Sequence, residues 1–561
     1  MSVFSSVRGN RVGRSVFNLS HVKRFTCDMG ELIPALVLEC VPGDTFKIGA
    51  DVVTRFQPLV APILDSVDMT VHYFFVPTRL LFDNDKDWET FLTGGKDGTD
   101  ESVSLPLYAL GDFDGGGSAN PQFPFSNNIR FGKYSLWDYL GLPVPANDTD
   151  GLKTVAIRDT NHINGLIPRA YTKIWNEYYR DENLVDEASL SNDTILYRSW
   201  KKDYFTSALP WQQRGVSPAL PISGTIPVDI SSLVLNHVRV GLLSEDDDNQ
   251  KIKALRANSS NSFDLAIGSS ASSSPLLESE VHKLKGSVLS HDGTVNLENA
   301  STFDVAVLRE AFQIQRWLEL NARGGVRYTE FLKAHFGLAP RDEVLQRPQY
   351  IGGTKSSIVV SEVLQTSATV DSSPDKKGSP QGNLAGHGLG AMSDYVCTYT
   401  AKEFGYIIGI ASWMPKPSYQ QGVNRMFSRE TKYDWYFPEF AHLSEQAVTR
   451  GEVYAVGNSH DNDIFGYQSC YSEMRYMPSF NCADMRDTFS YWHLGRIFSS
   501  APSLNAGFLT TNPNFSGGIR KDIFADQKSK GLLVQFGNVV KAIRPLPVYG
   551  TPGFIDHVGR M

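Results

Sequence analysis

The stretch Val67-Asp-Met-Thr-Val-His-Tyr-Phe-Phe-Val-Pro77 decides the fold class. Apolar side chains fill every second position from its first residue onward, which is the period of a β-strand with one face in a core. Phe74 and Val76 make the other face partly apolar as well, so we expect this strand to be buried on both sides. Pro77 should end it, because proline has no N–H to donate to a neighbouring strand.

The same kind of pattern predicts further strands and only a few helices. We expect strands within 32–77 and at Glu403–Met414, Gly451–Val456 and Leu532–Phe536, and helices at 169–181 and 304–322.

Stretches rich in Gly and Pro separate these elements, and we expect 94–128 and 371–392 to be loops. Gly386-His-Gly-Leu-Gly-Ala391 formally matches a dinucleotide-binding pattern. No predicted strand precedes it, so a flexible loop is the better interpretation. The chain is therefore expected to be an all-β protein with long loops.

Residues 244–303 differ in composition from the rest of the chain. They contain 13 Ser and only two aromatic residues, and an acidic run at Glu245–Asp248 begins them. Such a segment supplies little apolar surface for a core. We therefore expect a surface insertion here.

The charge distribution limits where nucleic acid could bind. The 561-residue chain has a formal net charge of −8 at pH 7, whereas a protein that binds nucleic acid over its whole surface is usually basic. Residues 1–27 are the exception, because they hold no Asp or Glu. Their basic residues are Arg8, Arg11, Arg14, Lys23 and Arg24.

This composition predicts a flexible basic arm over 1–27. Mobile cations are enough to neutralise the phosphates of a nucleic acid, so we expect the five basic residues to contact phosphates without base specificity. Two alternatives stay open, which are a solvated tail and a strap that crosses to a neighbouring subunit.

Aromatic residues are concentrated in 397–498, which holds 21 of them. Four lie within Tyr433-Asp-Trp-Tyr-Phe437, so either this run is in the subunit core or one side of it packs on a neighbour. The prolines around it favour an irregular segment that reaches the surface. We therefore predict a subunit interface at Trp435, Tyr436 and Phe437.

The common catalytic and metal-binding motifs do not occur. No serine has the glycines of a nucleophile elbow, no H-E-x-x-H is present, and Gly353-Thr-Lys-Ser356 lacks the spacing of a phosphate loop. Asp83, Asp85 and Asp87 resemble the start of a calcium loop, but Trp88 occupies the position that requires glycine. We expect no catalytic residues, no metal and no cofactor.

The cysteines and the N-terminus indicate a reducing compartment. The five cysteines are odd in number and form no C-x-x-C pair, so we expect free thiols in a soluble protein folded in a cytosol. We also expect no signal peptide, because the first residues contain no apolar run.

Several blocks along the chain closely resemble the major capsid protein of microviruses, especially the gokushovirus group. These blocks are Cys27-Asp-Met-Gly-Glu-Leu-Ile-Pro34, Val41-Pro-Gly-Asp-Thr-Phe46, Val71–Pro77, Trp88–Gly94, Arg347–Gly353, Gly405–Gly409, Arg425–Phe427 and Tyr433–Pro438. They reach both halves of the chain, while the middle, about 140–303, matches weakly.

The resemblance implies an eight-stranded antiparallel jelly roll over 28–561, with long loop insertions, following the arm at 1–27. It implies assembly into a T=1 icosahedral shell around circular single-stranded DNA in the cytoplasm of a bacterial host. The expected partners are further copies of the chain, the genome, other viral structural proteins and a host receptor. Residues 244–303 are the candidate for the protrusion that such subunits form at the three-fold axes.

One alternative function stays open. Jelly rolls also host carbohydrate-binding and glycan-processing proteins, and a pair of catalytic carboxylates could come from distant parts of the chain. Particle mass separates the two functions, because a capsid protein should form uniform shells and an enzyme should not.

Overall fold

The computed structural model describes residues 13–84, 86–109, 133–142, 162–218, 240–241, 255–257, 263–265, 288–289, 305–364, 384–440 and 443–549. The chain divides into two compact units. One comprises 1–216 with 316–561, and the other is the continuous insertion Ser217–Gln315, which is wider than the predicted 244–303.

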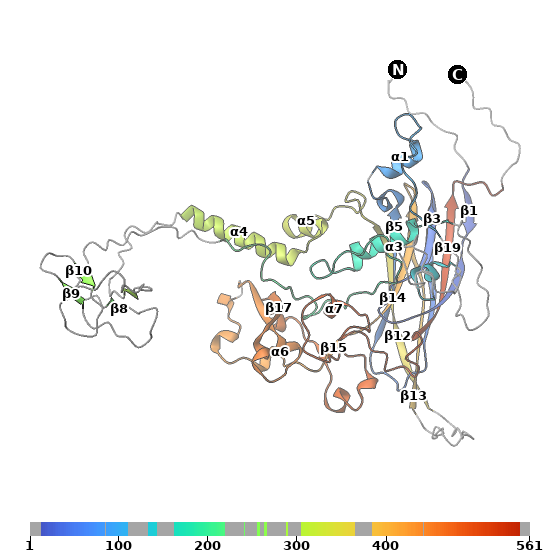
Figure 1. Ribbon diagram of the computed structural model, residues 1–561. Helices are drawn as coiled ribbons and strands as arrows, with labels where there is room; N and C mark the ends of the chain where they lie inside the picture. Colours follow the sequence, from blue (N-terminus) through green and yellow to red (C-terminus); the bar gives the residue numbers. More distant parts are fainter. Residues whose placement is uncertain are drawn as a thin grey trace, which may run out of the picture. The chain divides into compact units, whose positions relative to one another are not determined.

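A large antiparallel sheet dominates the first unit (Figure 1). Its nine strands follow the order β1-β19-β4-β13-β12-β5-β14-β3, and β2 pairs with the same strand β19 as β1 does. The strands are β1 Ser15–Asn18, β2 His21–Cys27, β3 Ile33–Cys40, β4 Thr45–Phe56, β5 Val67–Pro77, β12 Gln349–Leu364, β13 Leu384–Thr400, β14 Gly405–Pro415 and β19 Leu532–Arg544.

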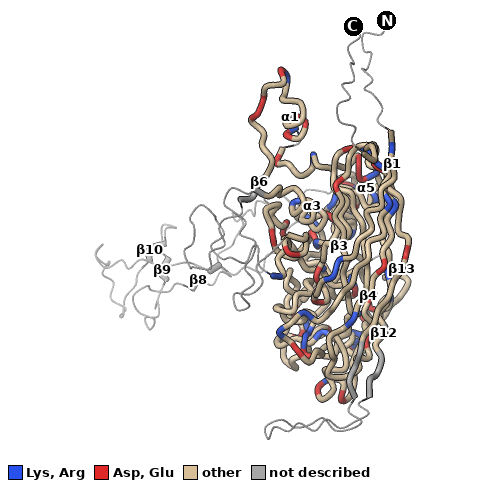
Figure 2. The backbone as a smooth tube through the Cα atoms, turned by 90° about the vertical axis from the view of Figure 1, so that its right-hand side faces the viewer, with Lys and Arg blue, Asp and Glu red and all other residues tan. Residues whose placement is uncertain are grey.

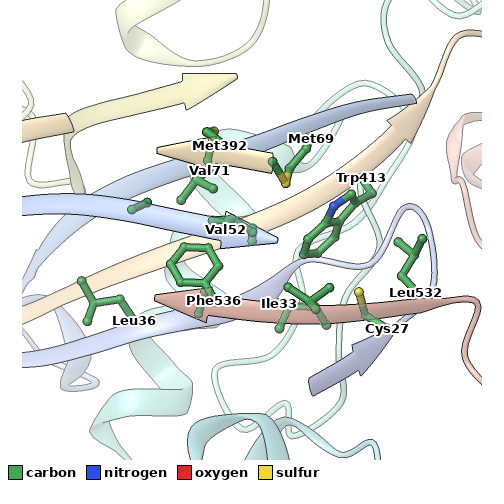
Figure 3. Close-up of a cluster of buried hydrophobic side chains, with 14 of the residues drawn as sticks. Cys27, Ile33, Leu36, Val52, Met69, Val71, Met392, Trp413, Leu532 and Phe536 are labelled. Atoms are coloured by element: carbon green, nitrogen blue, oxygen red, sulfur yellow. The ribbon is translucent and has the colours of Figure 1, made fainter. Parts of the chain in front are cut away.

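Strand β12 divides this sheet into two halves. Its first part, to Ile358, pairs with β5, and its second part, from Val359, pairs with β13. The two halves pack face to face around one hydrophobic core. Figure 3 shows Val52 and Phe536 from one half near Met69 and Trp413 from the other.

Two polar contacts cross the core at Trp413 and Thr54. Trp413 is fully buried, and its indole N–H donates to Thr54 Oγ1 at 3.1 Å. The Thr54 hydroxyl in turn lies 3.4 Å from the sulfur of Met69. These contacts join β14, β4 and β5, and the prediction of an antiparallel all-β protein is confirmed.

At one edge of the sandwich, side chains of β2 and β19 donate hydrogen bonds to the last strand, β3. Lys23 Nζ donates to Pro34 O at 2.6 Å and also to Tyr139 O. Asn538 Nδ2 donates to Ala35 O at 3.2 Å, and Arg544 donates to Glu39 O. The carbonyls of Pro34, Ala35 and Glu39 therefore have partners without another strand beside β3.

The outer face of β5 is covered as well, as predicted for the strand that ends at Pro77. Phe74 and Val76 pack against the helix α3 Leu166–Ile174 and the π-helical turn Trp175–Tyr179 that continues it. The Tyr171 hydroxyl donates to Leu32 O at 2.8 Å and fixes this helix over the sheet.

The other helices are α1 Asp87–Thr93, α2 Leu136–Leu140, α4 Val305–Gly324, α5 Tyr328–Phe336, α6 Arg450–Val453 and α7 Ala506–Leu509. The short strands are β6 Leu107–Ala109, β7 His162–Asn164, β8 Val240–Gly241, β9 Leu255–Ala257, β10 Phe263–Leu265, β11 Val288–Leu289, β15 Ser418–Tyr419, β16 Glu445–Thr449, β17 Ile464–Ser469 and β18 Ser479–Phe480. No described helix is both long and apolar enough to cross a membrane.

Both helix predictions are confirmed, since 166–179 and Val305–Gly324 are helical, and β14 and β19 confirm the strands at 403–414 and 532–536. The strand predicted at Gly451–Val456 is wrong. Residues Arg450–Val453 form α6, because Thr449 and Glu452 make a capping box in which Glu452 Oε1 accepts from the Thr449 N–H at 3.0 Å.

The flexible loop predicted at Gly386–Ala391 is also wrong, because β13 begins at Leu384. The glycines that suggested a loop are needed for close packing. A Cβ on Gly388 would lie 2.7 Å from the ring of Phe56, and one on Gly390 would lie 2.8 Å from Ile358. Glycine in a strand can mark such a close approach.

Candidate subunit interface and basic residues

Large apolar side chains are exposed along the segment between β14 and α7. We call this set the aromatic surface. It comprises Val423, Met426, Phe427, Tyr433, Trp435, Tyr436, Phe437, Leu443, Met474, Met477, Phe480 and Phe489. Exposed apolar groups in such numbers are typical of a surface that binds another protein.

The predicted interface residues belong to this surface. Trp435 is 54% exposed, Tyr436 46% and Phe437 45%. They follow a short 3-10 turn, Lys432–Asp434, and do not form a strand. The alternative placement in the subunit core is therefore wrong.

An ion pair between Arg429 and Glu473 supports the segment that carries Trp435. The Arg429 guanidinium lies 5.2 Å from the centre of the Trp435 ring and 3.3 Å from Glu473. Gln446 also donates to Glu473, at 2.6 Å. Since Arg429 and Glu473 are largely buried, Trp435 rests on a fixed support while its outer side stays open to solvent.

A second buried carboxylate supports the neighbouring part of the aromatic surface. Glu452 accepts from the Tyr204 hydroxyl at 2.9 Å and lies 3.2 Å from Arg425. Burial raises the pKa of Glu452, which the nearby Arg425 opposes. Val423, Met426, Phe427, Met477 and Phe480 line an adjoining hollow of about 460 Å³.

A hydrophobic cluster separate from the sandwich core lies under these loops. Arg496 is almost fully buried beside it, with its guanidinium 4.2 Å from the Phe508 ring centre. It donates to Gly517 O at 2.9 Å and to the Tyr419 hydroxyl. The loops thus have a core of their own, which sequence periodicity did not reveal because its residues come from separate short segments.

The predicted basic arm is only partly what the sequence suggested. Residues Ser15–Asn18 and His21–Cys27 are strands of the sheet, so a flexible arm as far as residue 27 is wrong. Their backbone groups pair with β19, whose edge would otherwise be unpaired. Arg8 and Arg11 lie outside the described residues.

The three remaining basic residues of this region have different environments. Arg14 and Arg24 are exposed, as a contact with DNA requires. The Lys23 ammonium is buried between β2 and β3, and burial lowers its pKa to about 8. The prediction of Lys23 as a mobile phosphate contact is wrong, because its side chain bonds to main-chain carbonyls.

A hollow of about 1630 Å³ is a candidate site for the glycan-processing alternative. Its carboxylates form ion pairs with neighbouring cations. These pairs are Asp181–Lys202, Glu182–Arg327, Glu330–Arg327, Asp342–Arg347 and Glu445–Arg323. A glycosidase needs one carboxyl that donates a proton and one that is free to react, and these paired groups do not supply them.

Two further observations concern reactive groups. All five cysteines are free thiols, as predicted, and Cys27, Cys40 and Cys397 are buried. Within the part of the chain that the structure describes, no three or more His, Cys, Asp or Glu side chains are grouped as metal ligands.

An antiparallel sandwich that exposes a large set of apolar and aromatic side chains is typical of a protein that associates with other protein chains. Sequence comparison gives the family. The protein-family model described as capsid protein (F protein) matches residues 5–554 of this chain. The chain therefore belongs to this capsid protein family of microvirus-type bacteriophages.

Three curated relatives agree with this assignment, and each alignment covers 98% of this chain and 97% of the relative. The capsid protein VP1 of Chlamydia phage 1 is 33% identical over 625 aligned positions. The VP1 proteins of Bdellovibrio phage phiMH2K and Spiroplasma virus 4 are each 30% identical. Family membership makes the chain a virion component that assembles with its own copies.

Proposed function

We propose that copies of this chain form a T=1 icosahedral shell that encloses circular single-stranded DNA. The aromatic surface is the observation that carries this proposal, because it exposes apolar side chains on a fixed support within a family of capsid proteins. Such side chains would contact neighbouring subunits, with Trp435, Tyr436 and Phe437 near the centre of the contact. No catalytic role is proposed for any residue.

The topology supports the finer description as an eight-stranded jelly roll. Strands β1 and β2 share one side of β19, so the sheet has eight strand positions along its path. The fold of this path into two packed halves is the arrangement that a jelly roll requires.

The remaining parts of the proposal concern the partners. Arg8, Arg11, Arg14 and Arg24 would contact the DNA, and 244–303 would form a protrusion that attaches to a receptor on the bacterial host. Replacing 244–303 with a short Gly/Ser linker should leave assembly intact, because loop length costs little, and should abolish attachment. Assembly with other viral proteins would take place in the host cytoplasm.

Sedimentation of the purified protein tests the assembly proposal. We expect shells of uniform mass from the wild-type chain and free, folded subunits from Trp435→Ala and Tyr436→Ala, made separately, with circular dichroism as the check on folding. Truncation of a central interface aromatic costs about 2 kcal/mol or more per contact, and a closed shell repeats each contact. Shells from both variants would contradict the proposed interface, and a wild-type monomer would favour the carbohydrate-binding alternative.

A further inference from the structure

The outer face of β2, β19 and β4 carries exposed basic side chains on an acidic protein. We define the basic sheet face by Arg24, Lys47, Arg55 and Lys541, all of which are exposed. Figure 2 views the strands from this side, with basic segments near the β1 and β4 labels. We propose that this face binds single-stranded polynucleotide, a proposal that rests on the proposed enclosure of DNA.

The strand register places two of these charges directly opposite each other. Lys541 on β19 pairs with Lys47 on β4, and both side chains point to solvent. Like charges in this position destabilise a sheet. Among the described residues, no carboxylate lies within ion-pair distance of either ammonium group, so a bound phosphate would relieve their repulsion.

The other two charges lie further along the same face. Arg55 is opposite Leu533, and Arg24 is opposite Gln535, two residues later on β19. Residues two apart on a strand share a face, so both guanidinium groups belong to the same side as the lysine pair. Asp51 lies between Lys47 and Arg55 on β4, and it accepts from Ser393 Oγ at 2.6 Å.

Aromatic and aliphatic groups fill the space between the two ends of this face. Tyr395 on β13 is 66% exposed, and the register places it in line with Gly49 and Val539. Val539 is also exposed, while Gly49 has no side chain to cover the neighbouring ring. Leu533, Val53 and Leu389 extend the apolar strip toward Arg55.

This combination fits a single strand better than a duplex or a protein. A single strand exposes bases that can stack on Tyr395 and the aliphatic groups, while its phosphates reach the cations. A duplex hides its bases. A second copy of the same face would bring Lys47 and Lys541 against their own charges, which opposes a symmetric protein contact.

The experiment measures the binding of a short oligo(dT) to purified subunits over a range of salt concentrations. Each lost phosphate contact on a single strand lowers the slope of log K against log salt by about 0.7, so Lys47→Gln with Lys541→Gln should lower it by about 1.4. Tyr395→Leu should weaken binding at all salt concentrations and leave the slope unchanged. The control is Lys402→Gln, an exposed lysine paired with Glu343, which should behave as wild type.

The outcomes separate this inference from the proposed function. A wild-type slope in the folded double variant would overturn the sheet-face site while leaving DNA enclosure in place. Wild-type subunits that bind no oligo(dT) would overturn this inference, whereas assembled particles that contain no DNA would overturn the proposed enclosure of DNA. Normal DNA binding with fewer shells from the double variant would show that the face contacts protein, which also overturns the inference.

Discussion

Two runs of aromatic and apolar residues have opposite surroundings in this molecule. Gly405–Pro415, the strand β14, is buried at every position, whereas Tyr433–Phe437 is exposed along its length. The strand has hydrogen-bonded neighbours on both sides, β5 and β3, and each of its faces meets a hydrophobic cluster. The exposed run does not pair with another strand, and the Arg429–Glu473 ion pair lies against Trp435. Backbone pairing with neighbouring strands therefore distinguishes the buried run from the exposed run.

Alanine substitution of the tryptophan in each run should give the largest difference in the free energy of unfolding. Trp413→Ala should lower the free energy of unfolding by about 3–5 kcal/mol, because it leaves a cavity between the two halves of the sheet and removes the N–H that the Thr54 hydroxyl oxygen accepts. Urea denaturation of the subunit measures this loss. A change below about 1 kcal/mol would mean that β14 and β4 are not packed as observed.

The Lys23 ammonium group beside β3 should make the free energy of unfolding depend on pH. Burial lowers the pKa of Lys23 from 10.5 to about 8, so between these values the unfolded chain binds more protons than the folded one. Stability should therefore rise with pH across this window, by up to about 1.4 kcal/mol per pH unit. Lys23→Met removes the titrating group.

Urea denaturation of both proteins at several pH values isolates this contribution. Tyrosine and cysteine side chains titrate in the same range, so the informative quantity is wild-type stability minus that of Lys23→Met. We expect this difference to grow in favour of the wild type as the pH rises from about 8 to 10.5. A difference that is constant with pH would refute the buried environment of the ammonium group.

A smaller effect is expected where glycines allow the sheet strands to pack closely. Gly388→Ala places a Cβ against the Phe56 ring and should destabilise the subunit by about 1–3 kcal/mol. Gly13→Ala is a matched control, because a Cβ there meets nothing within 4 Å and the residue does not have a positive φ. Thermal unfolding measures the stability of the two variants. Equal losses of stability would show that the Phe56 ring moves aside without a further cost.

The sequence predicted the sheet well because strand periodicity is local. The alternation in Val67–Pro77 and the apolar run at 403–414 were sufficient to identify β5 and β14. It failed at Gly386–Ala391 and Lys23, where the deciding contacts are with other elements: Phe56 on β4 for Gly388, and Pro34 and Tyr139 for Lys23. The exposed basic residues Lys47, Arg55 and Lys541 were not predicted as a site, because only the strand register brings them to one face.

The last prediction tests the other side of the comparison, at Trp435. More than half of this side chain is already exposed, and its main contact in the subunit is the Arg429 guanidinium. An exposed cation–π contact contributes about 0.5–1 kcal/mol, so Trp435→Ala should cost the subunit no more than about 1 kcal/mol in urea denaturation. Arg429 keeps its ion pair with Glu473 in this variant, so no buried charge is left without a partner. Trp413→Ala should then be several-fold more damaging, although both changes delete the same side chain. If the two variants lose the same free energy, Trp435 contributes to the subunit core after all, and any failure of Trp435→Ala to form shells would reflect unfolding instead of a lost contact with a neighbour.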